Sequence, residues 1–370
     1  MSKLRVAVVG AGRLGGFHAQ KLARMEHVEL VGVADPVESQ RQRVAAECCT
    51  AAWADYRELL GRIDAAVVAA PSRLHYALGM DLLAHGVHVL MEKPLAVTTA
   101  AADELLQTAR RNRLVLQVGH IERFNPALAA VAPHLRGPKY IEAVRASGFT
   151  FRSTDVGVVL DLMIHDLDLV LWLVRAEVRH VQALGLSVLG GQEDVANARI
   201  EFHNGCVATL SASRVSHQAA RRMQVWSARG LASIDFAART STLIRPSETL
   251  LARRFDANSL TPAQVEHYRE HLLEEHLPRQ QIQSEAVDAL ALELADFVEA
   301  VRTRRPPRVT GQQGRDAVAL AEQILTEIRA HAWDGTAEGP VGPLATPPPA
   351  VIPAPHWHLA PSPVLRREAG

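Results

Sequence analysis

Residues 4–15 read Leu-Arg-Val-Ala-Val-Val-Gly-Ala-Gly-Arg-Leu-Gly, and this stretch decides the fold of the first third of the chain. An apolar, β-branched run leads directly into closely spaced glycines, and a segment with helical periodicity follows. Glycine permits a tight turn and the close approach of a pyrophosphate, which the amide groups at the helix N-terminus then bind. The motif is weak by itself, but Asp35 ends the next predicted strand, 20 residues after Gly15. Together they predict a dinucleotide site.

The same stretch indicates which residues hold the dinucleotide and which cofactor it is. A carboxylate at Asp35 can accept hydrogen bonds from ribose hydroxyls, and it repels a 2′-phosphate. Pro36 and Val37 supply no adjacent cation that could receive such a phosphate. We therefore expect NAD rather than NADP, bound by Gly10, Gly12, Arg13, Leu14, Gly15 and Asp35.

Beyond the glycine loop, short β-branched runs alternate with helical segments, which is typical of a parallel α/β sheet. Strands are expected at residues 4–9, 28–34, 64–70, 88–91 and 114–118. After about residue 120 the pattern changes to one apolar helix and then strand-like runs with turn signals such as Asn204-Gly205. The fold class is thus α/β: a Rossmann doubly wound parallel sheet in residues 1–120, followed by an antiparallel sheet with flanking helices in residues 121–333.

The last part of the chain contains two amphipathic helices and a proline-rich tail. The helices are expected at residues 285–303 and 314–331, with Pro306 and Pro307 between them, and both should pack back on the body. Nine of the 20 prolines fall in the last 37 residues. Residues 334–370 are therefore predicted to be disordered or extended.

Charge and composition exclude several classes of protein. Forty basic residues balance 40 acidic ones over 370 residues, which argues against nucleic acid and anionic membrane surfaces as partners. Residues 156–174 are very apolar, but four ionisable side chains interrupt them, which predicts a buried helix and not a membrane span. Cys48, Cys49 and Cys206 form neither a disulfide framework nor a metal-ligand spacing. We expect a cytoplasmic protein without a metal, whose partners are small molecules or copies of itself.

The candidates for catalysis lie at the end of a strand and on the apolar helix. Lys93 follows the strand at residues 88–91, where ligands of open α/β sheets bind, although a solvated loop lysine is the alternative. One face of the helix carries, at helical spacing, Asp161, His165, Asp168 and Trp172. Asp161 can orient the His165 imidazole and stabilise its cation, as a general acid/base requires. Alternatively, the acids pair with nearby arginines and His165 is a satisfied core histidine.

Taken together, these motifs resemble the Gfo/Idh/MocA oxidoreductase family over roughly residues 1–330. The resemblance is carried by the glycine loop, Pro71-Ser72 with His75, Glu92-Lys93-Pro94, and the Asp161 to His165 pair. It implies a Rossmann domain joined to an α/β domain whose large, open, mostly antiparallel sheet forms the substrate wall and often the interface of a homodimer or homotetramer. It also implies that Lys93, Asp161 and His165 are catalytic. The residues that it places near the cofactor are Pro71, Ser72, His75, Glu92 and Lys93.

Two further stretches resemble a subgroup of bacterial enzymes, the UDP-N-acetylglucosamine 3-dehydrogenases, which supply a 3-keto sugar for lipid A assembly. They are GHIERFNP at residues 119–126, and FRSTD at residues 151–155, which leads into Asp161. Their donors suit diphosphate or hydroxyl oxygens, although a surface arginine or a loop cap is the alternative. The candidate substrate contacts are Arg123, Asn125 and Arg152, together with Asp161 and His165.

The expected reaction is NAD-dependent oxidation of a sugar hydroxyl to a ketone. His165 would be the base, Lys93 would polarise the substrate oxygen, and Asp161 would hold the imidazole. Two rivals stay open: a dehydrogenase of inositol or a free sugar, and a dinucleotide-binding regulator that kept the fold and lost the chemistry. The joint presence of the three catalytic candidates argues against the regulator.

Overall fold

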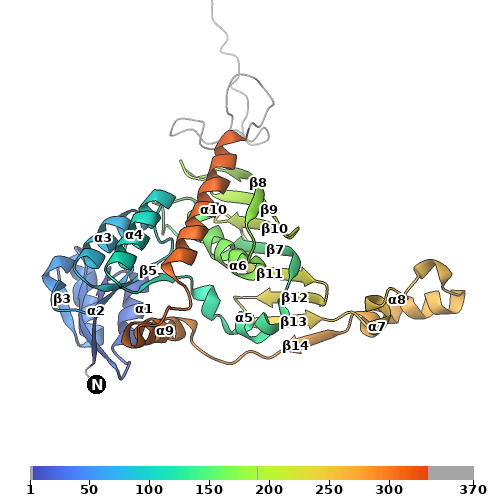
Figure 1. Cartoon of the computed structure of the whole chain (residues 1–370), viewed down its shortest axis with the longest axis horizontal. Coiled ribbons are helices and arrows are strands. Elements are labelled where there is room, and N and C mark those ends of the chain that lie inside the picture. Colours follow the sequence, from blue (N-terminus) through green and yellow to red (C-terminus); the bar gives the residue numbers. More distant parts are fainter. Residues whose placement is uncertain (1–2, 190, 332–370) are drawn as a thin grey trace, which may run out of the picture.

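The computed structural model describes residues 3–189 and 191–331, which form two sheets with helices packed on them (Figure 1). The predicted Rossmann sheet is confirmed: six strands lie in the order β3-β2-β1-β4-β5-β6, and every neighbouring pair is parallel. Within this sheet, the short β3 is the one strand that the sequence patterns did not predict. The strands are β1 (Leu4–Val9), β2 (Val28–Ala34), β3 (Ala51–Trp53), β4 (Ala65–Val68), β5 (His88–Glu92) and β6 (Leu116–Gly119).

Helices cover both faces of this sheet, as an all-parallel sheet requires. Alternate residues of β1 divide between the two faces: Val6 and Val8 belong to one apolar cluster, Ala7 and Val9 to the other. The cluster around Val8 also contains Phe297 of α9, so a helix near the end of the chain completes the core of the first domain. The helices are α1 (Arg13–Leu22), α2 (Glu38–Cys48), α3 (His75–Ala84), α4 (Thr99–Arg111) and α9 (Ala289–Thr303), and the 3₁₀ turns are η1 (Tyr56–Leu59) and η2 (Ser72–Leu74).

The second sheet has eight strands in the order β14-β13-β12-β11-β7-β10-β9-β8, and only the β7–β10 pair is parallel. The hairpin predicted at Asn204-Gly205 is confirmed, since it joins the antiparallel pair β9–β10, and a second hairpin at Ser227–Gly230 joins β11 to β12. β7 comes before the apolar helix in the sequence and lies inside the sheet, which the strand pattern after residue 120 did not show. The strands are β7 (Pro138–Ala146), β8 (Val178–Leu186), β9 (Val195–Phe202), β10 (Val207–Ser213), β11 (Ala220–Ser227), β12 (Gly230–Asp235), β13 (Thr240–Ile244) and β14 (Arg279–Ile282).

The apolar helix packs on one face of this second sheet and builds its core. It consists of a π-helical turn, η5 (Val159–Met163), and α6 (Ile164–Val174), and Leu167 and Val170 are fully buried against the sheet. Within the described residues no helix is both long and apolar enough to cross a membrane. The short elements that lead into the sheet are η3 (Ile121–Phe124), α5 (Pro126–Val131) and η4 (Ala132–His134).

The remaining helices differ in how much of the body they contact. α10 (Gly311–Ala330), expected at residues 314–331, lies against α4 of the first domain and against α6 and β8 of the second. α7 (Glu248–Leu251), η6 (Ala257–Ser259) and α8 (Pro262–His276) form an arm, residues 245–278, that projects away from both sheets (Figure 1). The predicted tail, residues 334–370, lies outside the described residues.

Candidate active site

The glycine loop after β1 has a backbone that only glycine accommodates. Gly10 has φ +99°, and a Cβ there would lie 2.5 Å from the carbonyl oxygen of Ala69. A Cβ at Gly15 would lie 1.8 Å from the carbonyl oxygen of Gly10. The loop can therefore turn tightly between β1 and α1, as a dinucleotide site requires.

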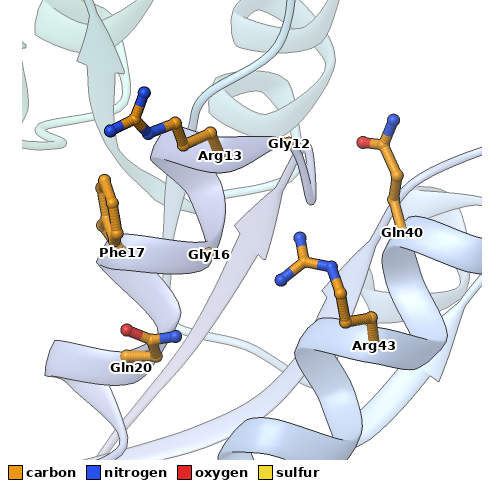
Figure 2. Close-up of a pocket in the computed structure, with 7 residues that line it drawn as sticks. All are labelled: Gly12, Arg13, Gly16, Phe17, Gln20, Gln40 and Arg43. Carbon is orange, nitrogen blue, oxygen red and sulfur yellow. The ribbon is translucent and has the colours of Figure 1, made fainter.

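The N-terminus of α1 is free to bind an anion. Gly12 precedes the helix, no side chain caps its first amide groups, and no acidic residue stands in its first turn. Beside it, a pocket of about 440 Å³ separates α1 from α2 (Figure 2). Arg13 and Arg43 contribute guanidinium groups to this pocket, and Arg43 is a residue that sequence reasoning missed. These features fit the phosphates of a dinucleotide.

Asp35 has a different set of neighbours from the one expected. Its carboxylate accepts hydrogen bonds from the amide groups of Ala11 at 2.7 Å and Val37 at 2.8 Å, so it ties the glycine loop to β2. The guanidinium of Arg41 lies 3.1 Å from the carbonyl oxygen of Pro36. Pro36 and Val37 supply no cation, as expected, but the first turns of α2 bring the guanidinium of Arg41, which sequence reasoning missed, to the end of β2.

Lys93 is held in place at the end of β5 by a residue of the second domain. Its Nζ donates to Oδ1 of Asp161 at 2.9 Å and to the carbonyl oxygen of Asp161 at 2.7 Å. Both side chains are 17% exposed. The alternative of a solvated loop lysine is therefore excluded, and the two domains meet at this pair.

Asp161 does not orient His165, contrary to the expected helical pairing. Asp161 lies within the π-helical turn η5, where hydrogen bonds reach five residues instead of four and the direction of each side chain changes. The wider turn also leaves the Asp161 carbonyl available to Lys93. The expected carboxylate–imidazole pair is thus replaced by a carboxylate–ammonium pair.

The surroundings of His165 favour the neutral form of its imidazole. Burial above all, and then the positive charge of Lys93, lower the pKa of His165 well below its usual value. Its Nδ1 has no hydrogen-bond partner among the described residues. The ring of His120, which is 1% exposed, stands edge-on to it with centroids 6.1 Å apart. At neutral pH the imidazole is therefore uncharged.

Glu92 faces the interior and not the cofactor loop. Burial acts to raise the pKa of Glu92, but the hydrogen bond and charge of His18 outweigh it and hold that pKa below its usual value. Oε1 of Glu92 lies 2.7 Å from Nε2 of His18 on α1, and Oε2 accepts from the amide of Lys93 at 3.2 Å. The Glu92–His18 pair therefore connects α1 to the backbone of Lys93.

His75 is the first residue of α3, and Ser72 is the first residue of the preceding turn η2. His75 is 1% exposed, and its ring nitrogens lie 2.7 Å from the carbonyl oxygen of Pro94 and 2.9 Å from that of Ala70. His75 therefore joins the end of β4 to the loop after Lys93. Pro71 and Ser72 stand at the beginning of η2.

Arg123 and Asn125 are not available to a substrate, because both are buried and satisfied within the protein. The Arg123 guanidinium lies 3.3 Å from Oδ1 of Asp168 and over the ring of Trp172, 4.5 Å from its centroid. Asn125 caps α5 and donates to the carbonyl oxygen of Phe236 at 3.2 Å. Asp168 and Trp172 therefore contact Arg123 and not a ligand. For Asp168 this is the alternative named above, in which the acids of the helix pair with nearby arginines.

A second buried ion network escaped sequence reasoning. Arg145 of β7 donates to Glu122 at 2.8 Å and, with two nitrogens, to Asp166 of α6 at 2.8 and 3.0 Å. All three side chains are less than one-tenth exposed. The network fixes α6, and with it His165, on the second sheet. Arg152 by contrast is exposed, in the loop between β7 and η5.

Two family models match most of this architecture. The first, described as an oxidoreductase family with an NAD-binding Rossmann fold, matches residues 4–120. The second, described as the GFO/IDH/MocA C-terminal domain, matches residues 132–233. The glycine loop and Asp35 lie in the first match, and Asp161 and His165 lie in the second.

Individual relatives agree with the family models. The UDP-N-acetylglucosamine 3-dehydrogenase of Acidithiobacillus ferrooxidans is 36% identical over 331 residues, which cover 89% of this chain and 99% of that one. A solved structure of that enzyme superposes with a TM-score of 0.77 over 89% of this chain and 99% of that chain. The scyllo-inositol 2-dehydrogenase (NAD(+)) of Bacillus subtilis is 27% identical over 83% of this chain and 89% of that one.

The fold, the arrangement of the site and the relatives all indicate an NAD-binding dehydrogenase. The chain binds NAD in its first domain and is a dehydrogenase that oxidises or reduces a sugar. It belongs to the Gfo/Idh/MocA oxidoreductase family.

Proposed function

We propose that the protein oxidises the 3-hydroxyl of UDP-N-acetylglucosamine to a ketone, with NAD as the hydride acceptor. The observation that carries the proposal is the similarity to the Acidithiobacillus enzyme over nearly the whole of that chain, at a higher identity than the inositol dehydrogenase shows. The Lys93, Asp161 and His165 cluster supports the chemistry, because it joins a fixed cation to a neutral base. A dehydrogenase of inositol or a free sugar is the second candidate.

In this proposal three side chains divide the work. The glycine loop and Asp35 would hold NAD, which would supply the acceptor for the hydride that leaves the carbinol carbon. His165, which is uncharged at neutral pH because its pKa is lowered, takes the hydroxyl proton as the hydride leaves. Lys93 stabilises the negative charge that develops on the substrate oxygen. Asp161 keeps the ammonium in position from two oxygens.

The setting of the reaction is also part of the proposal. A 3-keto nucleotide sugar is a substrate for transamination, which fits a cytoplasmic step of lipid A assembly. The outer face of the second sheet carries Tyr140 and Trp226, with ring centroids 5.1 Å apart, and both are half-buried in the single chain. We propose that this face packs in a homodimer or homotetramer, with no nucleic acid or membrane as partner.

The test is a panel of substrates at equal concentration. UDP-N-acetylglucosamine, N-acetylglucosamine and myo-inositol are each incubated with the full chain and NAD, the formation of NADH is followed, and the product is assigned by NMR. We expect reduction of NAD with the UDP-sugar and a ketone at C3. Faster turnover of inositol than of the UDP-sugar would overturn the proposal in favour of the second candidate.

A further inference from the structure

One guanidinium near the candidate active site has no partner among the described residues. The cations around it are already used: Lys93 pairs with Asp161, and Arg123 and Arg145 are buried in ion networks. Arg221, at the start of β11, is exposed and makes no hydrogen bond or ion pair through its side chain in the described part of the chain. A cation that the fold leaves free beside a site is available to an anionic ligand.

The register of the sheet shows which face Arg221 occupies. In the antiparallel β7–β11 pair, Arg221 stands opposite Arg145, and directly opposed residues project to the same face. Arg145 reaches Asp166 of α6 on that face, and Met223, two residues after Arg221, is fully buried there. Arg222 projects to the other face, where it pairs with Asp235 at 3.1 Å. Arg221 therefore lies on the same face as α6, at the end of the strand.

The positive charge of Arg221 acts on two residues of α6, His165 and Asp166. The pKa of His165 is lowered by burial first, and the positive charges that add to this effect include Arg221. Asp166, the neighbour of His165 in the sequence, is also within reach of this charge. An anion bound at Arg221 would thus lie on the same face of the sheet as the helix that carries His165.

An exposed aromatic ring belongs to the loop that starts beside Arg221. β7 ends at Ala146, which pairs with Ala220, and the chain then continues through residues 147–158 to η5. Phe151 in this loop is 85% exposed and has φ +55°, a backbone conformation that is uncommon outside glycine. Asp155 of the same loop accepts from the amide of Arg73 at 3.2 Å, so the loop reaches the first domain next to η2.

We propose that Arg221 and Phe151 form a subsite for the nucleoside diphosphate of the substrate, with Arg221 on the diphosphate and Phe151 stacked on the base. The inference rests on the proposed function, and it names the residues that select a nucleotide-linked sugar over a free one. Guanidinium groups bind phosphate oxygens with paired, charge-assisted hydrogen bonds. An exposed phenyl ring offers a stacking surface to any base.

The experiment measures binding of UDP, UMP and uridine by calorimetry to the full chain saturated with NAD. Arg221→Gln should weaken UDP about tenfold and uridine hardly at all, since it removes one charge-assisted contact to phosphate. Phe151→Ala should weaken all three ligands about tenfold, because each carries the base. Arg222→Gln is the matched control on the opposite face of the same strand, and Phe151→Tyr keeps the aromatic ring. Both controls should bind UDP as the wild type does.

The outcomes separate this inference from the proposed function. If the wild type oxidises UDP-N-acetylglucosamine while Arg221→Gln or Phe151→Ala keeps wild-type affinity for UDP, the subsite is wrong and the proposed function stands. Equal weakening by Arg221→Gln and Arg222→Gln also overturns the subsite, because the effect would then be general charge. If the wild type oxidises inositol but not the UDP-sugar, the proposed function itself fails.

Discussion

Lys93 shows how a single side chain acquires a role from its surroundings. Its position after β5 was already suggestive, but a lysine at a strand end is usually solvated. The two hydrogen bonds to Asp161 hold its ammonium beside the base, and the Glu92–His18 pair holds its backbone. The Lys93–Asp161 and Glu92–His18 pairs join residues that are 68 and 74 positions apart in the sequence.

The first prediction concerns the two groups that we expect to act in the transition state. Lys93→Met and His165→Asn should each lower kcat by about 10²- to 10⁴-fold, which is the usual contribution of a positioned acid or base. NAD affinity, measured by fluorescence quenching, should change little because neither residue belongs to the glycine loop. The double variant should be hardly slower than the poorer single one, since the groups act on one proton. Near-normal turnover of Lys93→Met would contradict the mechanism.

Glu293 of α9 is a buried acid that the mechanism does not use. It is fully buried, and neither carboxyl oxygen has a hydrogen-bond partner among the described residues. Burial, and next the charge of Glu92, raise the pKa of Glu293 well above its usual value. The folded protein therefore keeps this proton to a higher pH than the unfolded chain does. The stability that results is complete below the unfolded pKa and is lost as pH rises towards the folded one.

The second prediction follows from the loss of stability that ionisation of Glu293 causes as the pH rises. Glu293→Gln should remove the loss of stability at high pH, so the variant should gain in free energy of unfolding, relative to the wild type, between pH 5 and pH 8. Urea unfolding at a series of pH values measures the difference. Glu299→Gln, an exposed position on the same helix, should show no such trend. A pH-independent difference for Glu293→Gln would mean that Glu293 is ionised in the folded protein.

At the scale of elements, the junction of β2 and α2 decides how the cofactor is recognised. The carboxylate of Asp35 opposes a 2′-phosphate, while Arg41 lies on the same junction and Arg13 and Arg43 line the pocket beside it (Figure 2). The negative charge is thus the main barrier to NADP, because cations are already present.

The third prediction is that one substitution weakens this barrier. Asp35→Asn removes the charge but keeps an acceptor for the amide of Ala11, so the ratio of kcat/KM for NADP to that for NAD should rise at least tenfold. Adding Arg41→Gln to Asp35→Asn should reverse part of the gain, since it removes a cation. Steady-state kinetics with both cofactors provide the measurement. An unchanged ratio in Asp35→Asn would show that this carboxylate does not discriminate.

At the scale of the whole molecule, α8 and α10 begin with the same type of N-cap but differ in how much of their surface the protein buries. α8 and α10 both begin with a complete capping box, Thr261 with Gln264 and Thr310 with Gln313. α10 buries eight residues between the two domains, whereas α8 buries only His276 and leaves Leu273 64% exposed. An isolated helix of this length is only marginally stable in water, so packing should decide their stability.

The fourth prediction is that hydrogen exchange separates them. Amides of α8 should exchange by local opening, orders of magnitude faster than those of α10, which should approach the rate set by global unfolding. Exchange followed by mass spectrometry on the full chain resolves the two peptides. Equal protection of α8 and α10 would contradict the open arm and would show that something covers it in solution.

The sequence by itself determined the parallel sheet, the glycine loop, the Asn204-Gly205 hairpin and the family, because these depend on periodicity and on backbone conformations that a few neighbouring residues encode. Lys93, Asp161 and His165 could be named for the same reason, as each lies in a local motif. Only the tertiary structure decided which groups meet: Asp161 with Lys93, 68 residues away, and Arg123 with Asp168, 45 residues away. The π turn before α6 and the burial of Arg123 redirected side chains that regular helical spacing would have aimed at a ligand. Such pairings depend on how the domains pack, because the cost of burying a charge is offset only by a partner that folding brings from elsewhere in the chain.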